Sequence, residues 1–183
     1  MSMKSPAQDP EILTETRAAT VAVLPDTGRL SLRARKPALP ALGAALGLTL
    51  PERIGQRAAG AGQEVLCLGP DEWVLLAAPD KVADLLEACA RVELPHSLVD
   101  ISGREVTFRI TGPRAAELLS IGCPRDIATI AEGAGRRTVF DGVTVVLWRD
   151  GENSFRMDVW NSFSPHLRTL LDIGARELAA EPV

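Results

Sequence analysis

The sequence predicts an α+β domain whose antiparallel strands carry helices packed on one side. Period-two alternation of apolar and polar residues recurs, as at Val106, Phe108 and Ile110, which is typical of half-buried strands. Turn sequences such as Asp141-Gly142 join neighbouring apolar runs, which is typical of hairpins. Segments with helical spacing fall between these strands, and the order strand, helix, strand, then helix and meander favours the α+β class.

The first part of the chain predicts several strands and two helices. In the segment 29–35, Leu30 and Leu32 are expected to point inward while Arg33 and Arg35 point outward. A helix is expected to start near Pro37 and to stop at Gly47, and another to open at Pro79 and run through Arg91. We expect strands at 17–24, 29–35, 64–68, 73–77 and 96–101, with a loop or weak strand over 51–62.

The second part predicts one helix followed by a three-stranded meander and a closing helix. Pro113 lies near the first turn of the earlier helix, which ends at Gly122, and a loop covers 123–136. Phe155, Met157 and Val159 alternate with polar or large residues, so they define one face of the last strand. We expect strands at 105–110, 138–140, 143–148 and 155–160, and a helix capped by Asn161 or Ser162.

The chain length of 183 residues is that of one domain. We expect residues 1–16 to form an N-terminal arm and residues 17–180 to form the domain. The order of its elements divides that domain into approximate halves, 17–104 and 105–180.

Charge and cysteine usage exclude several classes of protein. The 20 basic and 24 acidic residues give a net charge of −4 with no basic arm, which argues against a nucleic-acid partner. The N-terminus has no apolar core typical of a signal peptide, and no run is long enough for a membrane helix, so a cytoplasmic protein is expected. Cys67, Cys89 and Cys123 form no C-x-x-C pair; the first two are expected in the core and Cys123 nearer the surface.

Catalytic equipment is scarce in the sequence. The only histidines, His96 and His166, lie far apart, and no metalloprotease, EF-hand or phosphate-loop motif is present. The adjacent Arg136 and Arg137 either clamp an anion or lie in a solvated loop or interface rim. We therefore predict no catalytic, cofactor-binding or metal-binding residues in this chain.

Aromatic and arginine side chains near the C-terminus instead suggest a protein interface. Trp148 and Trp160 end adjacent predicted strands, and this combination of residue types is enriched at protein interfaces. The alternative is that each tryptophan covers the core of its own chain. The candidate interface residues are Arg136, Arg137, Trp148, Arg149, Trp160, Phe163 and Arg168.

Several ordered motifs resemble the gamma subunit family of heterotetrameric sarcosine oxidases. They include Gly69-Pro70-Asp71-Glu72-Trp73, Ile110-Thr111-Gly112-Pro113 and Gly122-Cys123-Pro124-Arg125-Asp126. The segments 99–104, 146–149 and 155–163 fit the same family, and the resemblance covers roughly residues 20–178. It implies a fold of two intertwined antiparallel parts, similar to the folate-binding domain of the glycine-cleavage T-protein and its aminomethyltransferase relatives.

The resemblance also implies a function. It makes this chain a noncatalytic structural subunit of an αβγδ oxidoreductase that demethylates sarcosine to glycine, with tetrahydrofolate capturing the one-carbon unit. The partners are then the alpha, beta and delta subunits, mainly alpha. FAD, FMN, NAD, tetrahydrofolate and zinc belong to those other subunits, and no cofactor belongs to this one.

Two alternatives stay open at this point. One is an independent folate- or amine-binding protein, or an aminomethyltransferase-like enzyme, in which Arg104, Arg136 or Arg137 grips glutamyl carboxylates. The other is an assembly module that serves a different oxidoreductase.

Overall fold

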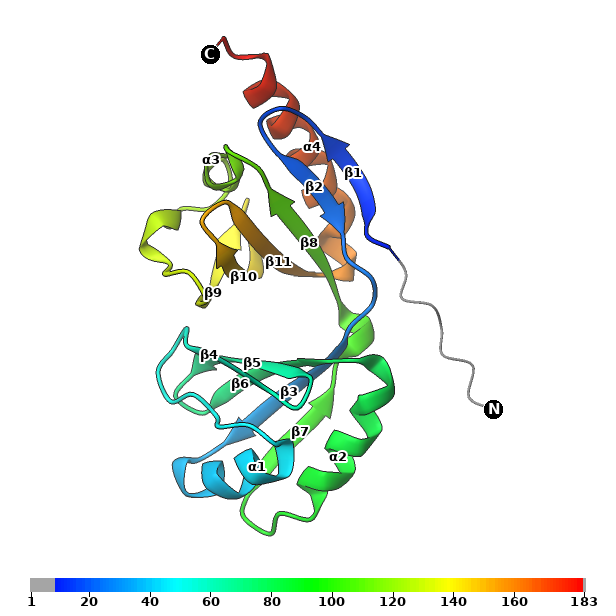
Figure 1. Cartoon of the computed structure of the whole chain (residues 1–183), viewed down its shortest axis with the longest axis vertical. Helices are drawn as coiled ribbons and strands as arrows, with labels where there is room; N and C mark the ends of the chain where they lie inside the picture. The colour runs from blue at the N-terminus through cyan, green and yellow to red at the C-terminus, as the bar shows by residue number, and fades with distance from the viewer. Residues whose placement is uncertain (1–8, 183) are drawn as a thin grey trace, which may run out of the picture.

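The computed structural model describes residues 9–182, which form two lobes stacked along the long axis of the molecule (Figure 1). Each lobe is one antiparallel sheet with two helices on its outer side, and the inner faces of the two sheets meet in the middle. The strand order is β1-β2-β8-β11-β10-β9 in the upper lobe and β4-β5-β6-β3-β7 in the lower lobe. The predicted class, antiparallel sheets with helices on one side and two intertwined parts, is confirmed.

The upper lobe combines the two ends of the described chain. Its members are β1 (Glu11–Glu15), β2 (Thr20–Val23), β8 (Glu105–Thr111), α3 (Ala115–Ser120), β9 (Gly135–Phe140), β10 (Val143–Gly151), β11 (Ser154–Trp160) and α4 (Ser164–Ala180). The lower lobe contains β3 (Gly28–Ala34), α1 (Leu39–Leu46), β4 (Arg57–Gly60), β5 (Gln63–Gly69), β6 (Glu72–Ala77), α2 (Val82–Ala90) and β7 (His96–Asp100).

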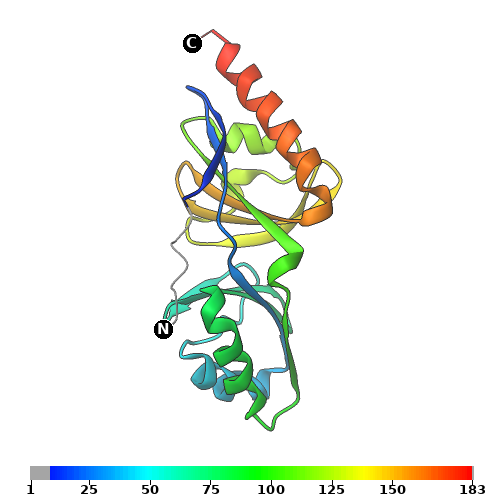
Figure 2. The same ribbon diagram turned by 90° about the vertical axis from the view of Figure 1, so that its right-hand side faces the viewer.

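The predicted division of the chain differs from the structure in two places. Part of the expected arm over residues 1–16 is strand β1, which pairs with β2 at the edge of the upper sheet; residues 1–8 lie outside the described part. The predicted halves 17–104 and 105–180 do not coincide with the lobes, because β2 pairs with β8 rather than with β3. The chain therefore crosses between the lobes twice, and Figure 2 shows both connections.

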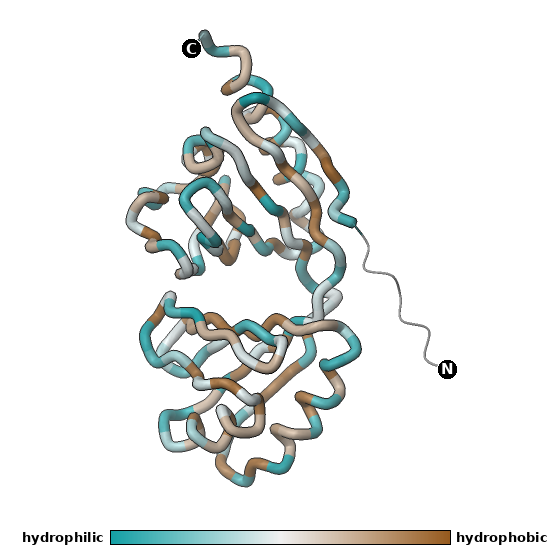
Figure 3. Tube along the Cα trace, viewed as in Figure 1, coloured by the Kyte–Doolittle hydropathy of each residue, from teal (hydrophilic) through white to brown (hydrophobic). Residues whose placement is uncertain are grey.

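Each lobe has its own apolar core between sheet and helices. Phe155, Met157 and Val159 point to α3 and α4 as predicted, and their neighbours on β11 point to the other lobe. In the lower lobe, Leu30 and Leu32 pack with α1 and α2. Gly47 ends α1 with a φ of 67°, a left-handed conformation that suits glycine. Figure 3 shows hydrophobic positions along the strands of both sheets.

The three cysteines lie inside the protein. Cys67 and Cys89 belong to the lower core, as predicted, and burial raises the pKa of both thiols. The prediction that Cys123 is nearer the surface is wrong. The turn after α3 packs this residue into the upper core, where it behaves as a small apolar side chain.

A third cluster of buried apolar residues joins the two sheets. Leu66, Val74 and Leu76 of the lower sheet pack against Val146 and Trp148 of the upper sheet. The two lobes therefore share a small core of their own, which fixes how the sheets face each other.

A buried arginine ties the lobes together beside this cluster. Arg29 on β3 is fully buried and donates to the Asp158 carboxylate of β11 at 2.9 Å. It also donates to Thr107 Oγ1 at 2.9 Å and to the Glu105 carbonyl at 3.2 Å, both on β8. A guanidinium buried this deeply needs such partners, because an unpaired buried charge is very costly.

We expect Arg29→Met to lower the free energy of unfolding by about 3 kcal/mol or more, because the substitution leaves the buried Asp158 without its cation. Urea denaturation of the purified chain measures this change. Arg33→Met is the matched control on the same strand: Arg33 is half-exposed, and its ion pairs are worth about 1 kcal/mol or less. Equal effects of the two substitutions would contradict this role of Arg29.

Candidate functional site: the cleft between the lobes

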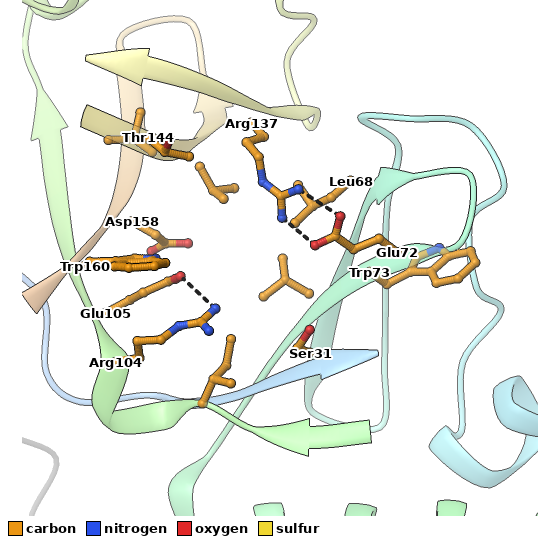
Figure 4. A pocket seen from close by; sticks show the side chains of 14 residues that line it. Ser31, Leu68, Glu72, Trp73, Arg104, Glu105, Arg137, Thr144, Asp158 and Trp160 are labelled. Atoms are coloured by element: carbon orange, nitrogen blue, oxygen red, sulfur yellow. Dashed lines mark hydrogen bonds and ion pairs between the residues drawn. The ribbon is translucent and has the colours of Figure 1, made fainter. Parts of the chain in front are cut away.

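A cleft of about 310 Å³ lies between the two sheets, beside the apolar contact that joins them (Figure 4). Its apolar wall includes Leu68, Val74 and Val146. Its charged lining comes from both lobes, from β6, β8, β9 and β11 and from the turn before β8. The charged residues are Glu72, Arg104, Glu105, Arg137 and Asp158.

Glu72 and Arg137 form an ion pair across the cleft. Arg137 Nη1 and Nη2 donate to the two Glu72 carboxylate oxygens at 2.8 and 2.6 Å, which is the bidentate arrangement that arginine favours. Arg33 approaches the same carboxylate at 3.1 Å. The hydrogen bonds from Arg137 hold the pKa of Glu72 below its ordinary value of 4.5, and the same bonds raise the pKa of Arg137. The pair links β6 of the lower lobe to β9 of the upper lobe.

Asp158 is the most fully bonded acid of the cleft. Besides Arg29, Thr107 Oγ1 donates to it at 2.6 Å and Trp148 Nε1 at 2.7 Å. Glu105 differs, because burial raises the pKa of its carboxyl group. Its oxygens form ion pairs with Arg29 Nε at 3.3 Å and with Arg104 Nη2 at 3.7 Å, and neither contact has hydrogen-bond geometry.

Trp148 is fully buried between the lobes, so the prediction that it lies on an interaction surface must be corrected. The guanidinium groups of Arg57 and Arg156 lie over its ring, 5.1 and 4.9 Å from the ring centroid. Arg57 donates to Asp150 at 2.8 Å, and Arg156 donates to Glu64 at 2.9 Å. Trp148 instead fits the alternative interpretation, in which the tryptophan is part of the core of its own chain.

Three of the predicted interface arginines are used within the chain. Arg137 pairs with Glu72, as described. Arg136 fills the space at Gly55 where a side chain would otherwise lie, and the φ of +88° at Gly55 also requires glycine. Arg149 donates to the Ile130 carbonyl at 2.8 Å and lies over the Phe155 ring. These contacts are internal, and the bond from Arg149 holds the loop before β9.

Trp160, Phe163 and Arg168 are predicted residues that the structure leaves open to solvent, and Arg137 is partly exposed as well. Trp160 is 49% exposed and Phe163 is 44% exposed. Arg168 on α4 is half-exposed and forms a surface ion pair with Glu11. Arg104 lies over the Trp160 ring at 5.3 Å from the centroid, so this ring closes one end of the cleft.

The sequence reasoning missed the charged residues between the lobes, above all Arg29, Glu72, Glu105 and Asp158. The alternation on β3 and β11 placed Arg29 and Asp158 on polar faces, which usually face solvent. One sequence feature indicated this arrangement: the polar faces of several strands carry charged residues of both signs, so two such faces are able to pack together and pair their charges.

The described residues contain neither a candidate metal site nor a candidate membrane-spanning helix. No group of three or more histidine, cysteine or acidic side chains within 9–182 is arranged to hold a metal ion. No helix in this part of the chain is long and apolar enough to cross a membrane.

The two-lobed arrangement defines a fold class. The chain is similar to the glycine cleavage system aminomethyltransferase T from Bartonella henselae, with a TM-score of 0.62 and 20% identity over 85% of this chain and 46% of that chain. It is more similar to a chain of the heterotetrameric sarcosine oxidase from Corynebacterium sp. U-96 in complex with pyrrole 2-carboxylate. There the TM-score is 0.83 and the identity 33%, covering 93% of this chain and 90% of that chain.

The particular family follows from the sequence matches. Residues 33–176 match the model of the sarcosine oxidase gamma subunit family. The sarcosine oxidase subunit gamma of Corynebacterium sp. (strain U-96) is 36% identical over 173 residues, or 90% of this chain and 83% of the relative. The sarcosine oxidase subunit gamma of Corynebacterium sp. (strain P-1) is 33% identical over 148 residues, which cover 78% of this chain and 72% of that relative. The chain belongs to the sarcosine oxidase gamma subunit family, as the resemblance indicated.

We expect Glu72→Gln to lower the free energy of unfolding by about 1 kcal/mol near neutral pH, since Arg137 is partly exposed and solvent screens the pair. The lowered pKa of Glu72 fixes the sign of the pH dependence. The stabilisation is complete above the ordinary value of 4.5 and is lost as the pH falls through the lower value in the folded state.

Urea denaturation over a series of pH values checks this prediction. The curves of the parent and of Glu72→Gln converge in acid. Glu87→Gln, which removes an exposed pair with Arg91 on α2, is the control and changes stability by about 0.5 kcal/mol or less. A difference at Glu72 that persists unchanged into acid would contradict the assigned ion pair.

Proposed function

We propose that this chain is a noncatalytic structural subunit of a heterotetrameric sarcosine oxidase. The observation that carries the proposal is the match to a chain of such an enzyme over 93% of this chain and 90% of the other. The complex oxidatively demethylates sarcosine to glycine, and tetrahydrofolate takes up the one-carbon unit. The partners are the alpha, beta and delta subunits, mainly alpha, and the assembly is cytoplasmic.

In this proposal the redox and one-carbon chemistry belongs to the other subunits. FAD, FMN, NAD, tetrahydrofolate and zinc are held there, and this chain holds no cofactor. The use of its charged residues supports a structural role. Arg29, Arg57, Arg137 and Arg156 each bond an acidic residue of the opposite lobe, so much of the buried charge serves to fix the shape of this chain.

The surface around the start of α4 is the proposed contact with a partner subunit. Trp160 and Phe163 are large aromatic side chains with almost half of their surface exposed just before α4, and Arg168 lies on that helix. Aromatic and arginine residues of this kind act as anchors at interfaces, where they fill pockets of the partner. Arg136, Arg137 and Arg149 make the internal contacts described above.

The function is tested by expressing the genes of all four subunits with and without this chain. We expect that omission of the chain prevents recovery of a stable four-subunit complex, because permanent complexes rely on large interfaces. Subunit masses after gentle purification, an absorption spectrum for flavin and the rate of sarcosine oxidation are the measurements. A complex that stays stable and fully active without this chain would overturn the proposal.

The interface is tested by Trp160→Ala and Phe163→Ala in the tagged full chain. Each substitution is expected to weaken capture of the partner subunits by about tenfold or more, since truncation of an interface anchor costs over 1 kcal/mol. Leu94→Ala is the matched control: Leu94 is 42% exposed but lies in the lower lobe, away from α4. Undiminished capture by the Trp160/Phe163 double variant would reject this surface.

A further inference from the structure

The polar groups that line the cleft fall into two sets. Glu72, Arg137 and Asp158 are fully engaged in the bonds described above. The side chains of Ser31, Arg104 and Glu105 make no hydrogen bond to any described residue, although all three line the same space. The first set joins the lobes, whereas the donors and acceptors of the second set face the cleft and are free to bond a ligand there.

Glu105 is the unusual member of the second set. Its side chain is only 10% exposed, yet no donor within residues 9–182 reaches its carboxylate at hydrogen-bonding geometry. Arg29 Nε, its nearest cation at 3.3 Å, is itself buried without an acceptor. Among the described residues, Arg29 Nε is the buried side-chain atom without a hydrogen-bond partner, whereas the Glu105 carboxylate faces the cleft, where a ligand is able to donate to it.

Arg104 supplies the opposite charge at the same place. Its guanidinium lies over the Trp160 ring and 3.7 Å from the Glu105 carboxylate, which is close but not hydrogen-bonded (Figure 4). Arg104 and Glu105 therefore form a long ion pair without a hydrogen bond at one cavity. A ligand with a single charge bonds to one of them and takes away the ion-pair partner of the other, whereas a ligand with both charges bonds to both.

We propose that the cleft binds a small amino-acid zwitterion. Its ammonium group donates to Glu105, its carboxylate accepts from Arg104, and Ser31 supplies a further polar contact. The apolar wall of Leu68, Val74 and Val146 receives a small apolar substituent. The volume of about 310 Å³ lies within the range of small-molecule sites. The cleft lies within one chain, and it shares Trp160 with the proposed partner contact.

Tryptophan fluorescence of the full chain tests the proposal. Trp160 is half-exposed and lies against Arg104, whereas Trp73, which also lines the cleft, and Trp148 are buried, so a ligand beside Arg104 changes mainly the Trp160 signal. The probes are glycine, sarcosine, L-proline and L-valine, and the half-molecules are acetate and methylamine. We expect saturable binding of at least one zwitterion, with both half-molecules about tenfold weaker or more, because each loses one charged contact.

Two conservative variants locate the site. Glu105→Gln and Arg104→Gln are each expected to weaken zwitterion binding by about tenfold, since each removes one charge-assisted hydrogen bond. Glu87→Gln and Arg91→Gln, which alter an exposed pair on α2, are the matched controls and leave binding unchanged. Circular dichroism verifies that each variant is folded.

With the free chain, three outcomes would overturn the proposal: no saturable signal from any zwitterion, acetate binding as tightly as the zwitterions, or unchanged affinity in both Glu105→Gln and Arg104→Gln. The same titration on the purified four-subunit complex separates a ligand site from a partner contact. Binding by the free chain but not by the complex would mean that a partner subunit fills the cleft, which also rejects the proposal. None of these results bears on whether the chain is required for assembly.

Discussion

The buried ion pair between Arg29 and Asp158 is the interaction on which the arrangement of the two lobes depends. Each sheet packs one apolar face against its own helices, so its other face carries charged residues. When the two charged faces meet, their charges lose contact with water. This loss is offset because residues of opposite charge pair across the two lobes. Arg29, Trp148 and Thr107 converge on one carboxylate, which leaves that acid little freedom to move.

Much of the fold is predictable from local patterns, whereas the contact between the lobes is not. The alternation along β3, β8 and β11 and the helical spacing of α1, α2 and α4 depend on neighbours in sequence, and the structure follows them. A polar strand face has the same pattern whether it meets water or another polar sheet. Trp148 illustrates the difficulty: its residue type suits an interface, and the interface that it occupies lies inside its own chain.

The same limit explains the candidate site. Sequence analysis identified Trp160 and Phe163 from their residue type, and exposure agrees with that choice. It singled out Arg136 and Arg137 as neighbours in sequence, but alternate residues of a strand point to opposite sides. Arg137 accordingly reaches Glu72, while Arg136 packs over Gly55. The charges that line the cleft come from strands distant in sequence, so only the pairing of the sheets brings them together.

The insertion of the lower lobe between β2 and β8 also sets an order for folding. The lower lobe consists of one continuous stretch, so it can close while the chain is still being synthesised. Strands β1 and β2 leave the ribosome first but must wait for β8, because Thr20 pairs with Thr111. Closing the lower lobe brings the ends of that long stretch together and so lowers the entropic cost of the later pairing. The upper lobe is therefore completed last, although two of its strands, β1 and β2, are synthesised first.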